Sequence, residues 1–98
     1  MTRLRFLPAV GIALILPGMA AAQDSFQLAQ GKGCFNCHDV TGPKEAPSFK
    51  GIAMHNKGRE DAAARLAEAL KTGKDGHKKF RGSDAELQQL IAYILATP

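Results

Sequence analysis

The chain contains no tryptophan and a single tyrosine, Tyr93, among its 98 residues. It has only two cysteines, so no framework of several disulfides can stabilise it. A domain of this size buries only about 60% of the surface that its unfolded chain exposes, and it usually needs an additional stabilising group. The core that the polypeptide builds by itself is therefore small.

The chain also lacks a hydrophobic run long enough to cross a membrane. The apolar stretch near the N-terminus, residues 6–16, is interrupted by Pro8 and Gly11 and is followed by Pro17. A membrane-spanning helix needs roughly 20 apolar residues. We therefore expect the chain to have no membrane span.

The N-terminal region instead has the three parts of a secretory signal peptide. Residues 1–5 are short and basic, the apolar stretch follows, and Ala20-Ala21-Ala22 forms a small-residue cleavage site. Cleavage after Ala22 would divide the chain into a signal peptide, residues 1–22, and one domain of 76 residues, 23–98. Because two arginines leave with the signal peptide, the formal net charge falls from +4 to +2. We expect a protein that is exported to the periplasm.

No segment has a convincing β-strand pattern, whereas four segments have helical spacing. The first helix is expected to start from a cap at Asp24 or Ser25 and to run to about Lys32. Residues 39–47 contain glycine and two prolines and should form a loop. A short second helix is expected over residues 48–56.

The last two helices have stronger sequence signals. Residues 60–71 have an amphipathic pattern, with acidic residues in the first turn and Gly73 just past the end. Residues 74–82 form a basic loop, after which Ser83 and Glu86 make a capping box ahead of apolar residues at helical spacing. The sequence therefore predicts one all-α domain of about four helices, with no second domain or internal repeat.

The segment Cys34-Phe35-Asn36-Cys37-His38 has the pattern C-x-x-C-H. This is the attachment pattern of c-type haem, in which two cysteines bond to the vinyl groups of the porphyrin and the histidine binds the iron. The spacing suits this role because one turn of chain directs Cys34 and Cys37 toward the ring and places His38 beneath the metal. The motif predicts one covalent haem c, which would also be the stabilising group that a small domain needs.

Three other uses of the cysteine pair agree less well with the sequence. A thioredoxin-like redox site would require a surrounding βαβ pattern, which is lacking. A structural zinc site takes four ligands, and the chain offers only two cysteines and three histidines, His38, His55 and His77. A disulfide between Cys34 and Cys37 would close too short a loop to stabilise the fold much.

The order of these elements resembles that of the small bacterial class I c-type cytochromes. It consists of a helix, C-x-x-C-H, a proline-containing loop, two middle helices, a connecting loop and a C-terminal amphipathic helix, and it covers residues 25–97. The resemblance implies a class I cytochrome c fold of about four helices wrapped around one covalent haem. It further implies a protein that shuttles single electrons between redox partners and is not an enzyme.

The resemblance also implies two internal contacts. In this family a proline carbonyl ahead of a short helix orients the haem histidine, as second-shell partners generally do. Pro47, rather than Pro43, has the matching register, so Pro47 is expected to orient His38. The family also packs a small residue of its first helix against an aromatic residue of its last, which would be Gly31 and Tyr93 in this chain.

The chain departs from the family pattern at the second axial position of the iron. Family members usually carry a methionine in the loop before the last helix, but residues 74–82 contain neither methionine nor proline. His77 lies in this loop, and imidazole is a good iron ligand, so we predict His77 as the sixth ligand. Met54 is the only methionine outside the predicted signal peptide and is the alternative, although its place on a short helix favours a packing role.

The sixth ligand decides between several functions. A second imidazole gives a lower reduction potential than a thioether and suits an electron carrier. A labile or vacant sixth position would instead suit a gas-binding or sensing haem protein. As sixth ligands, His55, Lys78 and Lys79 are weaker candidates than His77. A dedicated electron-accepting subunit of a periplasmic dehydrogenase is a third hypothesis with the same haem chemistry.

The loops carry an excess of positive charge. We define the basic collar as six residues expected near the exposed haem edge, where they would attract an acidic redox partner: Lys32, Lys50, Lys74, Lys78, Lys79 and Arg81. Apolar residues are expected to wall the haem pocket: Phe49, Ile52, Leu66, Leu70, Phe80, Leu87 and Ile91. Because the chain lacks a basic helix with interleaved aromatic residues, we expect no binding to nucleic acid.

Overall fold

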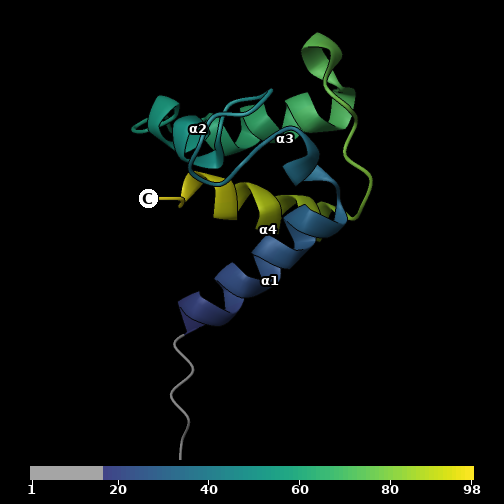
Figure 1. Cartoon of the computed structure of the whole chain (residues 1–98). Coiled ribbons are helices and arrows are strands. Elements are labelled where there is room, and N and C mark those ends of the chain that lie inside the picture. The colour runs from purple at the N-terminus through teal and green to yellow at the C-terminus, as the bar shows by residue number, and fades with distance from the viewer. Residues whose placement is uncertain (1–16) are drawn as a thin grey trace, which may run out of the picture.

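The structure, a computed structural model, describes residues 17–98 (Figure 1). Most of the predicted signal peptide therefore lies outside the described residues. Within them the chain forms four α-helices and two short 3₁₀ turns, which are α1 (Pro17–Gly31), η1 (Cys34–Asn36), α2 (Phe49–His55), α3 (Ala62–Thr72), η2 (Lys74–Gly76) and α4 (Asp84–Leu95). The predicted all-α domain of about four helices is confirmed.

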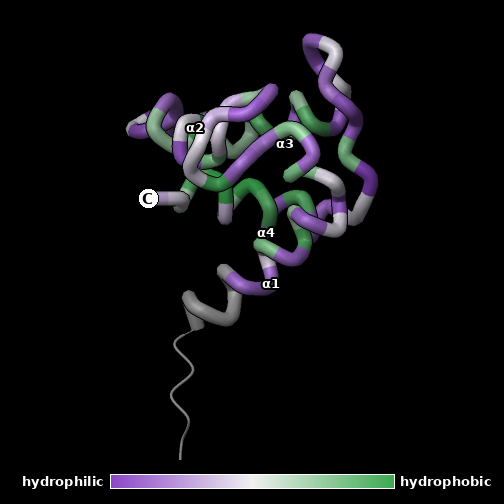
Figure 2. The backbone as a smooth tube through the Cα atoms, viewed as in Figure 1, coloured by the Kyte–Doolittle hydropathy of each residue, from purple (hydrophilic) through white to green (hydrophobic). Residues whose placement is uncertain are grey.

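Helix α4 is the element against which the other three helices pack. It contacts α1, α2 and α3, and Figure 1 shows α2 and α3 on one side of it and α1 on the other. Its apolar side chains are buried at Leu87, Leu90, Ile91 and Ile94. Figure 2 shows α4 as one of the most hydrophobic stretches of the chain. The helical spacing in the sequence thus corresponds to the sides of α4 that the other helices cover.

Helix α1 begins at Pro17, so the predicted cap at Asp24 or Ser25 is wrong. Alanine is the strongest helix former, and residues 20–22 are three alanines, so the helix continues upstream of the predicted cap. Ser25 is buried, with 3% of its surface exposed. Its hydroxyl accepts a hydrogen bond of 3.3 Å from the side-chain amide of Gln89, and it therefore connects α1 to α4.

The expected boundaries of the two middle helices agree with the structure. Ser48 caps α2, and its hydroxyl accepts a hydrogen bond of 2.9 Å from the backbone N–H of Gly51. Helix α3 ends at Gly73, which has a left-handed φ of 68°. Glycine is favoured at such a helix end because it has no Cβ to oppose that conformation.

The centre of the hydrophobic core is a cluster of Ala29, Phe49, Leu90 and Ile94. The apolar residues that the sequence places around a haem are all buried or half-buried: Phe49, Ile52, Leu66, Leu70, Phe80, Leu87 and Ile91. Helices α1, α2 and α4 each contribute a residue to this cluster.

The predicted packing of Gly31 against Tyr93 is wrong. A Cβ atom built on Gly31 would meet nothing within 4 Å. Ala29 is completely buried, and Tyr93 packs against the cluster that contains it. Two positions along a helix rotate a side chain by about 200°, so Ala29 faces α4 whereas Gly31 faces away from it.

The capping box predicted at the start of α4 is present. The Ser83 hydroxyl accepts a hydrogen bond of 3.1 Å from the Glu86 backbone N–H, and the Ser83 backbone N–H donates one of 3.0 Å to the Glu86 carboxylate. This second bond lowers the pKa of the Glu86 carboxyl below its usual value, and the positive charge of Lys32 adds to the effect.

A pH dependence follows from this lowered pKa. A carboxylate with a lowered pKa stabilises the folded state above its unfolded pKa, about 4.3 for glutamate, and the stabilisation is lost as the pH falls through the folded value. We expect Glu86→Gln to lower the melting temperature near neutral pH, with the difference from wild type disappearing below pH 4 or so. Melting curves over a pH series would measure this. A difference that stays constant down to low pH would contradict it.

None of the helices within residues 17–98 combines the length and the apolar character that crossing a membrane requires.

Candidate functional site

The C-x-x-C-H motif forms a single tight turn between α1 and the loop that follows. Gly33 has a left-handed φ of 80° and starts the 3₁₀ turn η1. The carbonyl oxygen of Cys34 accepts two hydrogen bonds, one of 3.3 Å from the backbone N–H of Cys37 and one of 3.0 Å from that of His38. Both cysteines and the histidine are therefore held on one turn of chain.

The two cysteines are unpaired thiols in different surroundings. Cys34 is half-buried and packs against the core cluster, whereas Cys37 is exposed. Burial raises the pKa of the Cys34 thiol, because an apolar environment disfavours the charged thiolate. The arrangement leaves both sulfur atoms free to form bonds to a porphyrin.

The ring of His38 is oriented by the loop over residues 39–47. Its Nδ1 lies 2.5 Å from the carbonyl oxygen of Pro47. The loop is held in place by a backbone hydrogen bond of 3.0 Å from Ala46 to Cys37 and by one of 2.9 Å from Phe49 to Asp39. If Nδ1 carries the proton and donates to Pro47, the lone pair of Nε2 is free to bind a metal.

The ring of His77 lies next to the ring of His38. Their centroids are 6.2 Å apart, and the ring planes are inclined by 30°. The Nδ1 of His77 lies 2.7 Å from the carbonyl oxygen of Lys78, so this ring also has Nδ1 engaged with a backbone carbonyl. In both histidines Nδ1 lies next to a backbone carbonyl, so Nε2 is the nitrogen available to bind a metal.

The position of His77 depends on the turn that follows α3. The backbone N–H of His77 donates to the carbonyl oxygen of Lys74 at 3.1 Å, which closes η2. A Cβ built on Gly73 would lie only 2.8 Å from the carbonyl oxygen of His77. Glycine at this position thus has two functions, since it ends α3 and lets the His77 backbone approach closely.

The separation of the two histidine rings is compatible with one metal ion between them. A metal–imidazole bond is about 2 Å long and the ring centroid lies about 1 Å further away, so two imidazoles on opposite sides of one iron have centroids about 6 Å apart. The observed separation of 6.2 Å agrees with this value. No group of three or more His, Cys, Asp or Glu side chains that could hold a metal ion by themselves occurs in residues 17–98. The donor set therefore suits a haem iron better than a structural zinc ion.

A cavity of about 440 Å³ lies next to the turn that leads to His77. Its walls include Leu66 and Ala69 of α3, and both cationic and acidic residues, among them Arg59, Lys74, Glu68 and Asp75. Neither the two cysteines nor His38 or His77 lines it. The cysteine pair and the adjacent histidine, held on one turn, are what fits the cofactor that the motif predicts.

Met54, the alternative sixth ligand, lies on α2 with 67% of its surface exposed. Its neighbour His55 is also exposed. The structure brings together Cys34, Cys37 and His38 on one turn and places the His77 ring next to that of His38. Within the described residues, no hydrogen bond joins the Met54 side chain to these four residues.

An aromatic chain that the sequence analysis did not identify runs from the site to the surface. The Phe49 ring lies 5.7 Å from that of His38, and the Phe35 ring lies 5.5 Å from that of Phe49. Phe26, which is 42% exposed, lies 5.0 Å from Phe35. Phe35 occupies a variable position inside the motif, so the pattern itself gave no sign of its packing role.

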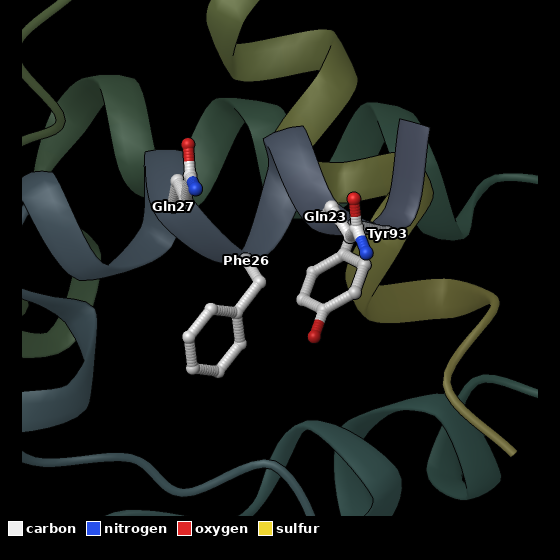
Figure 3. A pocket seen from close by; sticks show the side chains of 4 residues that line it. All are labelled: Gln23, Phe26, Gln27 and Tyr93. Carbon is white, nitrogen blue, oxygen red and sulfur yellow. The ribbon is translucent and has the colours of Figure 1, made fainter. Parts of the chain in front are cut away.

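A second pocket, of about 500 Å³, lies between α1 and α4 (Figure 3). Gln23, Phe26 and Gln27 line it from α1, and Tyr93 lines it from α4. In Figure 3 the rings of Phe26 and Tyr93 extend from their helices in the same direction. None of the candidate haem ligands lines this pocket.

Known proteins resemble both the sequence and the fold. Residues 20–94 match the family described as cytochrome C oxidase, cbb3-type, subunit III. Cytochrome c-552 of Hydrogenobacter thermophilus is 36% identical, over 83% of this chain and 87% of that protein. Cytochrome c-551 of Pseudomonas aeruginosa is 31% identical, over 79% of this chain and 80% of that protein.

A crystal structure of the class 1 cytochrome MtoD from Sideroxydans lithotrophicus superimposes with a TM-score of 0.64 at 30% identity, covering 81% of this chain and 95% of that one. The family indicated by these sequence and fold similarities is the one that the cysteine pair and the histidine on one turn also indicate. The chain belongs to the small monohaem class I c-type cytochromes, which are electron carriers rather than enzymes and hold haem c covalently through a cysteine pair, here Cys34 and Cys37.

Proposed function

We propose that His38 and His77 bind the haem iron from opposite sides, and that residues 23–98 act as a periplasmic single-electron carrier of low potential. The observation that carries the proposal is the pair of neighbouring rings, whose centroids are 6.2 Å apart. The bound haem supplies a reversible one-electron change at its iron. Cys34 and Cys37 anchor the ring, and the two histidines set the potential.

The hydrogen bonds of both rings support this assignment. His38 has Nδ1 next to the carbonyl oxygen of Pro47, and His77 has Nδ1 next to that of Lys78. Donation from Nδ1 to a carbonyl fixes the tautomer, makes Nε2 the metal-binding nitrogen and raises its basicity. Pro47 and the Lys78 backbone would thus be the orienting partners on the two sides.

Two imidazoles favour the ferric state more than one imidazole and one thioether do. We therefore expect a lower reduction potential than in relatives with a methionine ligand. The position of His77 supports this choice, because its ring centroid lies 6.2 Å from that of His38, whereas Met54 lies on α2 with 67% of its surface exposed. An electron carrier also benefits from an occupied sixth position, since an occupied position excludes gases and other small ligands.

The ligation can be tested by spectroscopy of the purified protein. We expect six-coordinate low-spin haem in both oxidation states, without the charge-transfer band of methionine-to-iron bonding. Met54→Leu should have the same spectrum as the wild type. High-spin haem that binds carbon monoxide readily would contradict the proposal and support the gas-binding hypothesis. A methionine band that disappears in Met54→Leu would identify Met54 as the ligand.

Export to the periplasm is proposed from the signal peptide at residues 1–22. Its basic start, apolar stretch and alanine cleavage site support removal of this segment after Ala22. The mass of the haem-containing protein from a periplasmic extract should correspond to a chain that starts at Gln23. A mass that includes residues 1–22 would contradict the cleavage.

The basic collar is proposed as the docking surface for an acidic redox partner. All six residues are exposed, which supports the proposal, and Lys78 and Lys79 directly follow His77. Lys32 forms an ion pair, because its Nζ lies 3.6 Å from the Glu86 carboxylate. The free charge of the collar near the haem would therefore come mainly from the His77 loop.

Charge reversal at Lys78 and Lys79 would test this surface. We expect the double change to glutamate to slow electron transfer to an acidic acceptor about tenfold or more at low ionic strength, with the difference shrinking as salt is added. Rates from stopped-flow absorbance over a salt series would measure it. A matched control is Lys57→Glu with Arg59→Glu, two exposed cations outside the collar. Equal slowing by both pairs would contradict a specific docking surface.

A further inference from the structure

The loop that carries His77 is attached to the rest of the protein at its C-terminal end. Phe80 donates a backbone hydrogen bond of 2.8 Å to the carbonyl oxygen of Leu70, at the end of α3. The Phe80 side chain is half-buried and packs against the core cluster. His77 itself is exposed, and its ring makes its hydrogen bond to Lys78 within the same loop. The attachment at Phe80 is therefore close enough to influence where His77 lies.

Lys32 connects this attachment to two helices. It follows α1, and its Nζ lies 5.5 Å from the centroid of the Phe80 ring. The same Nζ lies 3.6 Å from the carboxylate of Glu86 on α4, and the Lys32 side chain is only 28% exposed. A partly buried cation over an aromatic face is attracted to it, and the carboxylate holds the cation in that position.

Gly82 lies at the centre of this contact. A Cβ built on it would lie 2.8 Å from the Glu86 carboxylate, 2.9 Å from the Phe80 ring and 3.0 Å from the Lys32 Nζ. All three are side-chain atoms, so an alanine at this position would force them apart. We call Lys32, Phe80, Gly82 and Glu86 the loop clamp. A Cβ at residue 82 would have to displace the ends of these three side chains.

We propose that the loop clamp is a positioning device that holds His77 on the iron and so keeps the sixth position closed to external ligands. The inference rests on the proposed ligation by His77. Phe80 is only three residues from His77, so a loosened Phe80 lets the loop move and increases the fraction of molecules in which His77 has left the metal. Entry of an external ligand is proportional to that fraction. In this role the clamp residues hold the loop in place and do not bind the iron.

The test is carbon monoxide binding to the ferrous, haem-containing protein, measured by stopped-flow absorbance. We expect Lys32→Ala to raise the binding rate about fivefold to tenfold, because it removes both the cation–π contact and the ion pair. Lys32→Arg retains both and should restore a rate near that of the wild type. Gly82→Ala should act like Lys32→Ala while leaving the charges in place.

Lys71→Ala is the matched control. Lys71 Nζ lies 3.1 Å from Asp84, so this change also removes an ion pair to α4, but the pair joins α3 to α4 and does not involve the loop. Melting temperatures of all variants would show how much each change destabilises the fold. Equal carbon monoxide rates for Lys32→Ala and Lys71→Ala would overturn the inference.

The wild-type spectrum separates this inference from the ligation on which it rests. If the wild type is low-spin and only Lys32→Ala and Gly82→Ala bind carbon monoxide faster, both the ligation by His77 and the loop clamp are supported. Low-spin wild type with no difference between the clamp variants and the control overturns the clamp and leaves the ligation intact. High-spin wild type, or a methionine band, overturns both.

Discussion

Replacement of His77 with alanine is expected to produce high-spin haem that binds carbon monoxide. The change removes the proposed sixth ligand from an exposed loop, so it should leave the core, and therefore the fold, largely unaffected. Replacement with methionine should instead raise the reduction potential by on the order of 0.1 V, a fraction of the roughly 0.8 V over which axial ligands set haem potentials. Absorbance spectra and redox titrations of the purified variants would measure both effects.

His55→Ala is the matched control for this experiment. His55 is another exposed histidine, at the end of α2, and it has no ring contact with His38 among the aromatic contacts of the described chain. We expect this variant to have the spectrum and the potential of the wild type. If His77→Ala remains low-spin with an unchanged potential, another residue is the ligand. A change caused by His55→Ala alone would identify His55.

Phe49→Ala is expected to destabilise the fold by about 3–5 kcal/mol, the usual cost of deleting a buried phenylalanine side chain. Phe49 is one of the two largest fully buried side chains, with 1% of its surface exposed. Its ring contacts those of Phe35, His38 and Tyr93. The expected loss is a large part of the roughly 5–15 kcal/mol that keeps a typical domain folded.

Denaturant unfolding of the haem-containing protein would measure this loss. Met54→Ala is the control on the same helix, because Met54 is 67% exposed and its truncation should change the stability by about 0.5 kcal/mol or less. Because the Phe49 ring also packs against His38, we expect the visible spectrum of Phe49→Ala to change along with its stability. A loss no larger than that of Met54→Ala would mean that Phe49 does not support the core.

Local patterns made most of the fold predictable from the sequence. Helix caps depend on residues within three or four positions of each other, so Gly73 and the Ser83–Glu86 box were found at the expected places. The haem motif is similarly local, since Cys34 and His38 lie on one turn. Interactions confined to one turn can be read from spacing alone.

Contacts between distant segments could not be predicted in the same way. Both Ala29 and Gly31 are small residues of α1, and only the rotation of that helix against α4 decides which of them is buried. The loop clamp is a similar case, since Lys32 and Glu86 are far apart in the chain. Charges are plentiful in this sequence, and spacing does not indicate which of them meet.

The sequence by itself determined that this protein has four helices in the described chain, a covalent haem site at Cys34 and Cys37, and no methionine in the loop before the last helix. Only the tertiary structure decided that the ring of His77 lies next to that of His38, with the centroids 6.2 Å apart, and that Phe80 and Lys32 attach the loop of His77 to the body of the protein. The physical reason is the separation along the chain of the residues that interact. Helices and motif turns are governed by neighbours along the chain, whereas the second side of a metal site depends on how a flexible loop is anchored by packing across the whole fold.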